Sequence, residues 1–204
     1  MASTFKLKSC EIKYNDYICI KMEFVRVLRG YDHLWSVKIP EMEADELTLL
    51  FRRWSRIEYL LDFFLSNVAD LKEYFQISSI SEAIKDSMED ACMLERMILA
   101  FPSTENLDTL FRPLGELDMS MTELTREKAR NWWRHRHPSW LRVYAIRLEA
   151  NVFVITGGAI KLTPTMQERC HTEEELTKMN TCREYLRQNG VFDQASFMDK
   201  INNK

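Results

Sequence analysis

Hydrophobic and polar positions alternate in three short runs near the start of the chain. Apolar residues alternate with charged ones in 10–14, and again in 18–24 after the turn-forming pair Asn15-Asp16. A third alternating run covers 35–39 and stops at a proline. Alternation with a period of two is typical of strands that are buried on one side. The pattern predicts a β-hairpin followed by a third short strand.

Helical periodicity replaces this alternation over residues 43–101. The first part predicts one long amphipathic helix that ends near Asn67, followed by a short helical turn at 71–75. Ser79 and Glu82 have the spacing of a capping box and predict a second long helix. We expect the two long helices to form an antiparallel hairpin packed on the sheet. Their Met and aromatic residues favour core packing, and a groove for a partner is the alternative.

A second strand-forming region follows in the last third of the chain. The run 141–148 largely alternates, and the β-branched and aromatic run 152–155 suits a central strand covered on both faces. Gly157 and Gly158 predict the end of this strand where the backbone bends or a group approaches closely, and Lys161 follows. A strand end that is flanked by glycines and cations is suited to binding an anion. The alternative is an ordinary hairpin buried in a core.

Two further Ser/Thr-x-x-Glu pairs predict helices, because this spacing is a capping box. The pair that begins at Ser120 predicts a short helix at 122–133, and the pair that begins at Thr172 opens a C-terminal helical extension at about 172–202. We therefore expect a single α+β domain over 1–204, in which a small antiparallel-rich mixed sheet packs against a helical hairpin and carries additional C-terminal helices. The N-terminal strands and the later strand pair are expected to share this sheet.

The composition excludes several classes of protein. With 204 residues, of which 46% are hydrophobic, the chain is long enough to bury a full core. No apolar run reaches the roughly 18 residues of a membrane span, and the N-terminus carries charges where a signal peptide is apolar. The five cysteines include no CxxC pair, which indicates reduced thiols. These features predict a cytoplasmic protein without a membrane partner.

The sequence predicts neither a metal site nor a cofactor. Cys170, His171 and Cys182 lack a fourth ligand at a spacing typical of zinc sites. The chain also has no Walker-type loop and no GxGxxG, HExxH or GxSxG motif, so the common nucleotide-binding, zinc-protease and hydrolase signatures are absent. We expect side chains alone to carry any chemistry.

Charge is distributed unevenly along the chain, whose net charge is −3. In residues 124–161, eight cations stand against two carboxylates, so this segment carries +6 and the remainder carries −9. Clustered positive charge on one face favours binding of a polyanion. Within the segment, WWRHRHPSW at 132–140 mixes cations with stacking rings, which suits RNA or single-stranded nucleic acid. The alternative is a solvated loop whose tryptophans are anchored in the core.

Part of this region resembles a known family. LRVYAI at 141–146 followed by VFVITGGAIKLTPT at 152–165 resembles the paired C-terminal strands of RelE/HigB-like toxins of bacterial type II toxin–antitoxin systems, in which an arginine begins one strand and a lysine follows the next. Arg142, Tyr144 and Lys161 occupy the matching positions. The segment LFRPLGELD resembles the one that precedes those strands. The resemblance implies a small sheet flanked by helices, messenger RNA as substrate, often on the ribosome, and a cognate antitoxin as partner.

The implied reaction is metal-independent cleavage of RNA by attack of a ribose 2′-hydroxyl on the adjacent phosphate. Arg142 and Lys161 are the candidates that stabilise the charge of the phosphorane. His135 and His137 are candidates for proton transfer, and Tyr144 for positioning the ribose or donating a proton. The remaining candidate RNA contacts are Arg126, Lys128, Arg130, Arg134, Arg136 and Arg147. The alternative for Arg142 is an ion pair within the fold, with Glu149 or Glu168.

A non-catalytic function is the competing hypothesis. The chain is about twice as long as such toxins usually are and is acidic overall, and Leu162 stands where the family often has a second lysine. These features favour a RelE-like module that binds protein or RNA without cutting it. The cation cluster and the proton carriers favour the endoribonuclease.

Overall fold

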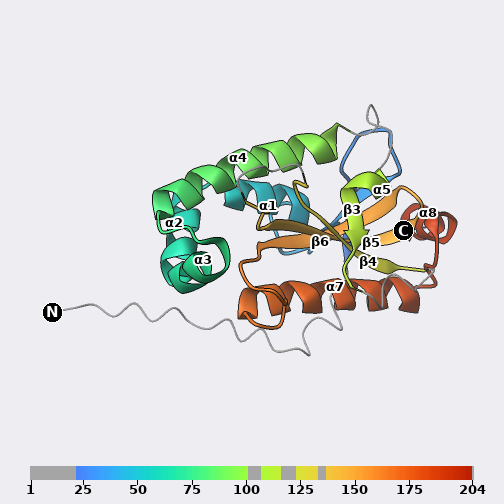
Figure 1. The fold of residues 1–204 in the computed structure, drawn as a ribbon. Coiled ribbons are helices and arrows are strands. Elements are labelled where there is room, and N and C mark those ends of the chain that lie inside the picture. The colour runs from blue at the N-terminus through green and yellow to red at the C-terminus, as the bar shows by residue number, and fades with distance from the viewer. Residues whose placement is uncertain (1–21, 101–106, 116–122, 133–136, 204) are drawn as a thin grey trace.

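Six strands form the centre of the molecule (Figure 1). The computed structural model describes residues 22–100, 107–115, 123–132 and 137–203. Within them the strands are β1 Glu23–Arg26, β2 Leu34–Lys38, β3 Phe111–Pro113, β4 Thr125–Ala129, β5 Leu141–Glu149 and β6 Val152–Ile160. They form one sheet in the order β1-β2-β6-β5-β4-β3. Neighbouring strands are antiparallel, except that β2 and β6 are parallel.

This topology confirms that early and late strands share one mostly antiparallel sheet, as the sequence predicts. The third predicted strand is β2, which lies beside β6, and the predicted late pair is β5 and β6. The hairpin predicted at 10–24 lies almost entirely outside the described residues. Its last residues belong to β1, which pairs with β2.

Helices cover both faces of the sheet (Figure 1). In the described residues they are α1 Glu46–Trp54, α2 Ile57–Ser66, α3 Val68–Phe75, α4 Ile80–Leu99, α5 Leu107–Leu110, α7 Cys170–Gln188 and α8 Gln194–Asn202. The layer of α1, α2 and α4 lies on one face, as the sequence predicts, and buries Trp54, Phe64 and Phe153 in one apolar cluster. On the other face, α7 and α8 bury a second cluster that includes Trp35 and Phe197.

The two adjacent glycines of β6 permit this close packing on both faces. Contrary to the sequence prediction, Gly157 and Gly158 do not end the strand, which continues to Ile160. A Cβ atom on Gly158 would lie 2.5 Å from Leu50 Cδ2 of α1, whereas one on Gly157 would meet Glu175 and Lys178 of α7. Successive residues of a strand face opposite ways, so the pair admits one helix on each side. The close approach predicted for the glycines is therefore that of the two helices.

The prediction of one long helix that ends near Asn67 is wrong, because the chain forms two helices, α1 and α2, that are separated at Ser55 and Arg56. The Ser55 N–H and hydroxyl both donate to the carbonyl of Phe51, which ends α1. Arg56 then has an extended backbone, and α2 begins after it. The predicted short turn at 71–75 is part of α3. Local hydrogen bonds at Ser55 thus divide into two helices a segment whose helical periodicity is continuous in the sequence.

The prediction of a short helix at 122–133 is also wrong, because Thr125–Ala129 forms the strand β4. Its side chains alternate between buried and partly buried positions. Pairing with both β3 and β5 satisfies the backbone of this segment. Tertiary hydrogen bonding therefore outweighs the local helical signal that begins at Ser120.

The remaining predicted helices are confirmed with small shifts. Ser79 caps α4 by accepting a hydrogen bond from the Glu82 N–H. The C-terminal extension consists of α7, which begins at Cys170, and α8. The capping box predicted at Thr172 is wrong, because Arg169 is the N-cap and the Thr172 hydroxyl donates to the carbonyls of Met166 and Arg169. Gly190, at φ +73°, follows the end of α7, where a glycine adopts such a backbone readily. In the described part of the chain, no helix has both the length and the apolar character needed to cross a membrane.

Candidate functional site

Cationic side chains of two neighbouring strands lie on the face of the sheet that α7 covers. In the register of β4 and β5, Lys128 pairs with Tyr144 and Arg126 pairs with Ile146. Tyr144 and Ile146 belong to the apolar cluster beneath α7 and α8, which identifies this face. Arg142 lies two residues before Tyr144 and therefore shares it. The strand register thus brings together cations that are widely separated in sequence.

These cations line a pocket of about 690 Å³. The sheet supplies one wall, and residues 164–167 with Leu176 of α7 supply the other. The lining residues are Leu114, Gly115, Arg126, Lys128, Arg130, Trp132, Arg142, Tyr144, Lys161, Pro164, Thr165, Met166, Gln167 and Leu176. Among the described residues that line the pocket, five are cations and none is a carboxylate. A concave surface with this charge has the electrostatics of an anion-binding site.

Arg142 is held at the pocket by the main chain. Its Nη1 donates to the carbonyl of Leu141 at 2.8 Å and to the carbonyl of Ser139. Burial, together with the neighbouring Arg130, lowers the pKa of Arg142 to about 10. The guanidinium therefore stays charged at neutral pH while it is largely removed from water. A bound anion would offset this cost.

Lys161 follows β6 and joins the same cluster. Its Nζ donates to the carbonyl of Thr163 at 2.7 Å and to that of Pro164. Burial lowers the pKa of Lys161 to about 8, and the charges of Arg142 and Lys128 act in the same direction. Several like charges thus act on one partly buried ammonium group. Its charge changes within the physiological range of pH.

The Tyr144 side chain is fully buried between Arg142 and the helix α7. Among the described residues, its hydroxyl has no hydrogen-bond partner. A buried polar group without a partner costs about 1–3 kcal/mol, and such a group at a pocket points to a ligand. Burial raises the pKa of Tyr144, so the phenol is a neutral hydrogen-bond donor.

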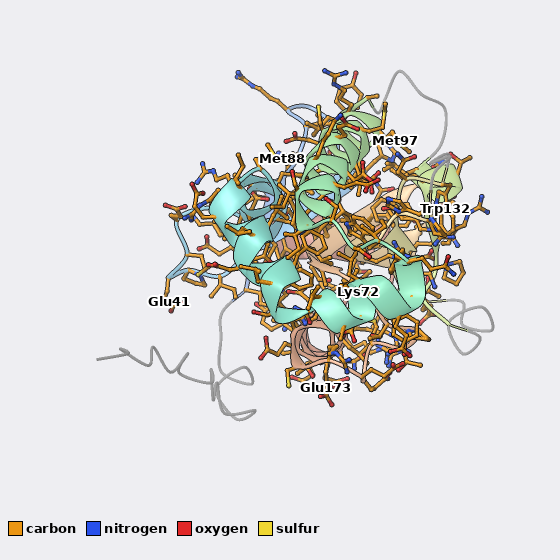
Figure 2. All side chains as sticks on the ribbon, turned by 60° about the vertical axis from the view of Figure 1, so that its left-hand side comes forward. Glu41, Lys72, Met88, Met97, Trp132 and Glu173 are labelled. Atoms are coloured by element: carbon orange, nitrogen blue, oxygen red, sulfur yellow. The ribbon has the colours of Figure 1, made fainter. Side chains whose placement is uncertain are left out.

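Trp132 forms an aromatic margin of the pocket, and Figure 2 shows it on the opposite side of the molecule from Glu41. Its Nε1 donates to the carbonyl of Leu110 at 3.0 Å, which fixes the ring. The Arg130 guanidinium carbon lies 4.0 Å from the ring centroid, and that of Arg112 lies 5.8 Å away. Stacked guanidinium and indole groups at a cationic pocket suit a nucleobase.

The other two cations of the pocket contact neighbouring segments. Lys128 Nζ donates to the carbonyl of Leu114 at 2.9 Å. Arg126 Nη1 donates to Asn180 Oδ1 of α7 at 2.9 Å. These contacts orient both side chains along the pocket wall.

Two of the predicted site residues lie elsewhere. Arg147 forms an ion pair with Asp108, with 3.2 Å between Nε and Oδ1, near the far end of β5. His137 Nε2 lies 3.0 Å from Asp86 Oδ2, and its ring stacks on Trp140 with 4.2 Å between centroids. Neither residue lines the pocket. Three further candidates, Arg134, His135 and Arg136, lie outside the described residues.

The second wall of the pocket was not predicted from the sequence. Residues 164–167 and Leu176 carry no charge pattern that would single them out. The sequence prediction named Trp132 only as one residue of the stretch 132–140, which suits nucleic acid. In the described ranges, no group of three or more His, Cys, Asp or Glu side chains is arranged to hold a metal ion.

Comparison of the chain with protein-family models, with curated proteins and with solved structures found no match.

The position of Lys161 predicts a pH dependence of anion binding. Because its pKa is about 8, the fraction that is charged falls as the pH rises from 7 to 9. Affinity for an oligoribonucleotide should fall over the same range, with a midpoint at or above about pH 8, since a bound anion favours the charged lysine. In the Lys161→Arg variant the guanidinium stays charged, so its affinity should change little. Fluorescence anisotropy at constant ionic strength measures both profiles, and identical profiles would exclude Lys161 from the binding site.

Proposed function

We propose that the protein binds RNA in the cationic pocket and cleaves it without a metal ion, as a RelE/HigB-like toxin would. The observation that carries the proposal is the convergence of five cations on one pocket that also contains an aromatic margin. RNA combines a chain of phosphates with bases that stack on aromatic and guanidinium groups. Messenger RNA, the ribosome and a cognate antitoxin are the partners that this proposal includes.

The proposed reaction is an intramolecular transesterification. The ribose 2′-oxygen attacks the adjacent phosphorus and the bond from phosphorus to the 5′-oxygen breaks, which leaves a 2′,3′-cyclic phosphate and a 5′-hydroxyl. Arg142 and Lys161 stabilise the negative charge that develops on the phosphorane. Tyr144, which is neutral and buried at the pocket, donates a proton to the leaving 5′-oxygen. The proton of the 2′-hydroxyl passes to a base, for which the sequence offers His135.

A non-catalytic RNA-binding module is the second candidate function. The observation that favours it is that Arg142 and Lys161 already donate to main-chain carbonyls. Both cations can therefore be oriented for binding alone. Of the two histidines proposed to transfer protons, His137 is engaged with Asp86 away from the pocket.

Cleavage of a labelled single-stranded RNA by the purified protein, with and without ribosomes, tests the proposal. In the reaction without ribosomes we expect cleavage that is unchanged by EDTA, because neither the sequence nor the described side chains present a metal-ligand cluster. The products should carry cyclic phosphate ends. Growth and messenger integrity are followed in parallel in a bacterial host that expresses the protein. If the protein neither cuts RNA nor slows growth, the non-catalytic function replaces the nuclease.

A further inference from the structure

Three buried side chains of α4 hold the segment that leads into β5. Asp86, Ser87 and Asp90 are each almost fully buried, and they project from α4 toward residues 137–140. The contacts that they make are His137 Nε2 to Asp86 at 3.0 Å, Trp140 Nε1 to the Ser87 hydroxyl at 2.9 Å, and the Ser139 hydroxyl to Asp90. In Figure 2, Met88 and Met97 mark the course of this helix.

The segment 137–140 in turn supports both central cations of the pocket. The carbonyl of Ser139 accepts a hydrogen bond from Arg142 Nη1. The carbonyl of Trp140 accepts one from the main-chain N–H of Lys161, at 2.8 Å. The polar face of α4 is therefore connected to the pocket through the main chain just before β5.

Of the two buried carboxylates of α4, Asp90 bonds to a residue that directly contacts a pocket cation. Its partner Ser139 bonds to Arg142, whereas Asp86 bonds to His137, which does not line the pocket. The negative charge of Asp90 also acts on Arg142, where it favours the charged guanidinium and so opposes the lowering of the Arg142 pKa by burial. Geometry and charge both connect Asp90 with Arg142.

We propose that Asp90 is a positioning residue for the pocket: it fixes Ser139, and thereby holds the Arg142 guanidinium in the orientation that receives a phosphate. The inference rests on the proposed RNA binding, but it extends to any phosphate-bearing ligand of the pocket. It gives α4 a function beyond packing on the sheet.

Asp90→Asn with Asp86→Asn as matched control tests the proposal. Each variant removes one buried negative charge from the same helix. Charge removal alone would strengthen binding of an anion, whereas loss of positioning weakens it, so the two explanations predict opposite signs. The probes are a fluorescein-labelled single-stranded oligoribonucleotide and inorganic pyrophosphate.

We expect Asp90→Asn to weaken binding of both probes about tenfold, and to reduce the salt slope of RNA binding by roughly 0.7, which is the value for one lost phosphate contact with a single strand. Asp86→Asn should stay within about twofold of wild type. Thermal unfolding shows whether each variant is folded under the assay conditions. If Asp90→Asn does not fold, Ser139→Ala, which removes the hydroxyl that donates to Asp90, is measured in its place with the same expectation.

Each outcome is decisive for the inference. Binding of both probes that is unchanged or tighter in Asp90→Asn, or in the substitute Ser139→Ala, would overturn it. Equal weakening in Asp90→Asn and Asp86→Asn would also overturn it, because the effect would then be a general one of the helix. If wild type binds pyrophosphate but not RNA, and the variant weakens pyrophosphate binding, the inference stands while the proposed function fails. If wild type binds neither probe, both fail.

Discussion

Replacement of Lys161 by alanine is expected to lower the rate of RNA cleavage by about 10² or more. This is the scale of the loss when one preorganised group that stabilises transition-state charge is removed. The lysine follows β6, and within the described residues its ammonium group donates to the carbonyls of Thr163 and Pro164 in its own loop. The substitution should therefore leave the sheet intact. Single-turnover cleavage of a labelled RNA measures the rate.

Lys72→Ala is the matched control for this prediction. Lys72 is an exposed lysine of α3, and Figure 2 shows it on the outer surface of that helix. Its removal changes the net charge by the same amount but takes no cation from the pocket. Cleavage should proceed at the wild-type rate. Cleavage by the Lys161→Ala variant at the rate of Lys72→Ala would exclude Lys161 from the proposed catalytic residues.

Replacement of Gly158 by alanine is expected to destabilise the protein by about 3 kcal/mol, at the upper end of the range for overpacked cores. The new Cβ atom would lie 2.5 Å from Leu50 Cδ2 and also press on the main-chain carbonyl of Arg142. The leucine can move, but the carbonyl belongs to the neighbouring strand and cannot do so without disturbing β5. For a chain of this size the melting temperature should fall by roughly 6–12 °C.

Gly115→Ala provides the control for this stability measurement. A Cβ atom at Gly115 would meet no heavy atom within 4 Å. Its melting temperature, from circular dichroism or calorimetry, should stay close to that of wild type. A Gly158→Ala variant as stable as Gly115→Ala would contradict the close packing of α1 on β6.

The strand pair β5 and β6 was predictable because its signals are local. Alternation in one run and continuous β-branched residues in the next are sufficient to identify two neighbouring strands, although the middle of β5 is buried on both faces. The structural role of the two glycines in β6 was not predictable from such local signals. Whether Gly157 and Gly158 end a strand or admit helices depends on α1 and α7, which lie far away in sequence.

The site was predicted in part for a related reason. Arg126, Lys128 and Arg130 were assigned to a helix, on which a spacing of two residues would spread them around the axis. In a strand the same spacing places all three on one face, beside Arg142. The two-residue spacing was therefore a strand signal, which the capping box at Ser120 obscured. The position of the wall formed by residues 164–167 depends on how α7 packs on the sheet. No local sequence pattern specifies this packing.

The salt dependence of RNA binding tests the central claim, that RNA occupies the cationic pocket, most directly. Affinity of a single-stranded oligoribonucleotide is measured over a range of salt concentrations for wild type and for an Arg130→Ala/Lys161→Ala double variant. Each phosphate contact with a single strand contributes about 0.7 to the slope of log affinity against log salt, so the double variant should bind more weakly with a slope that is shallower by roughly 1.4. Equal affinity and equal slope in the two proteins would contradict the claim.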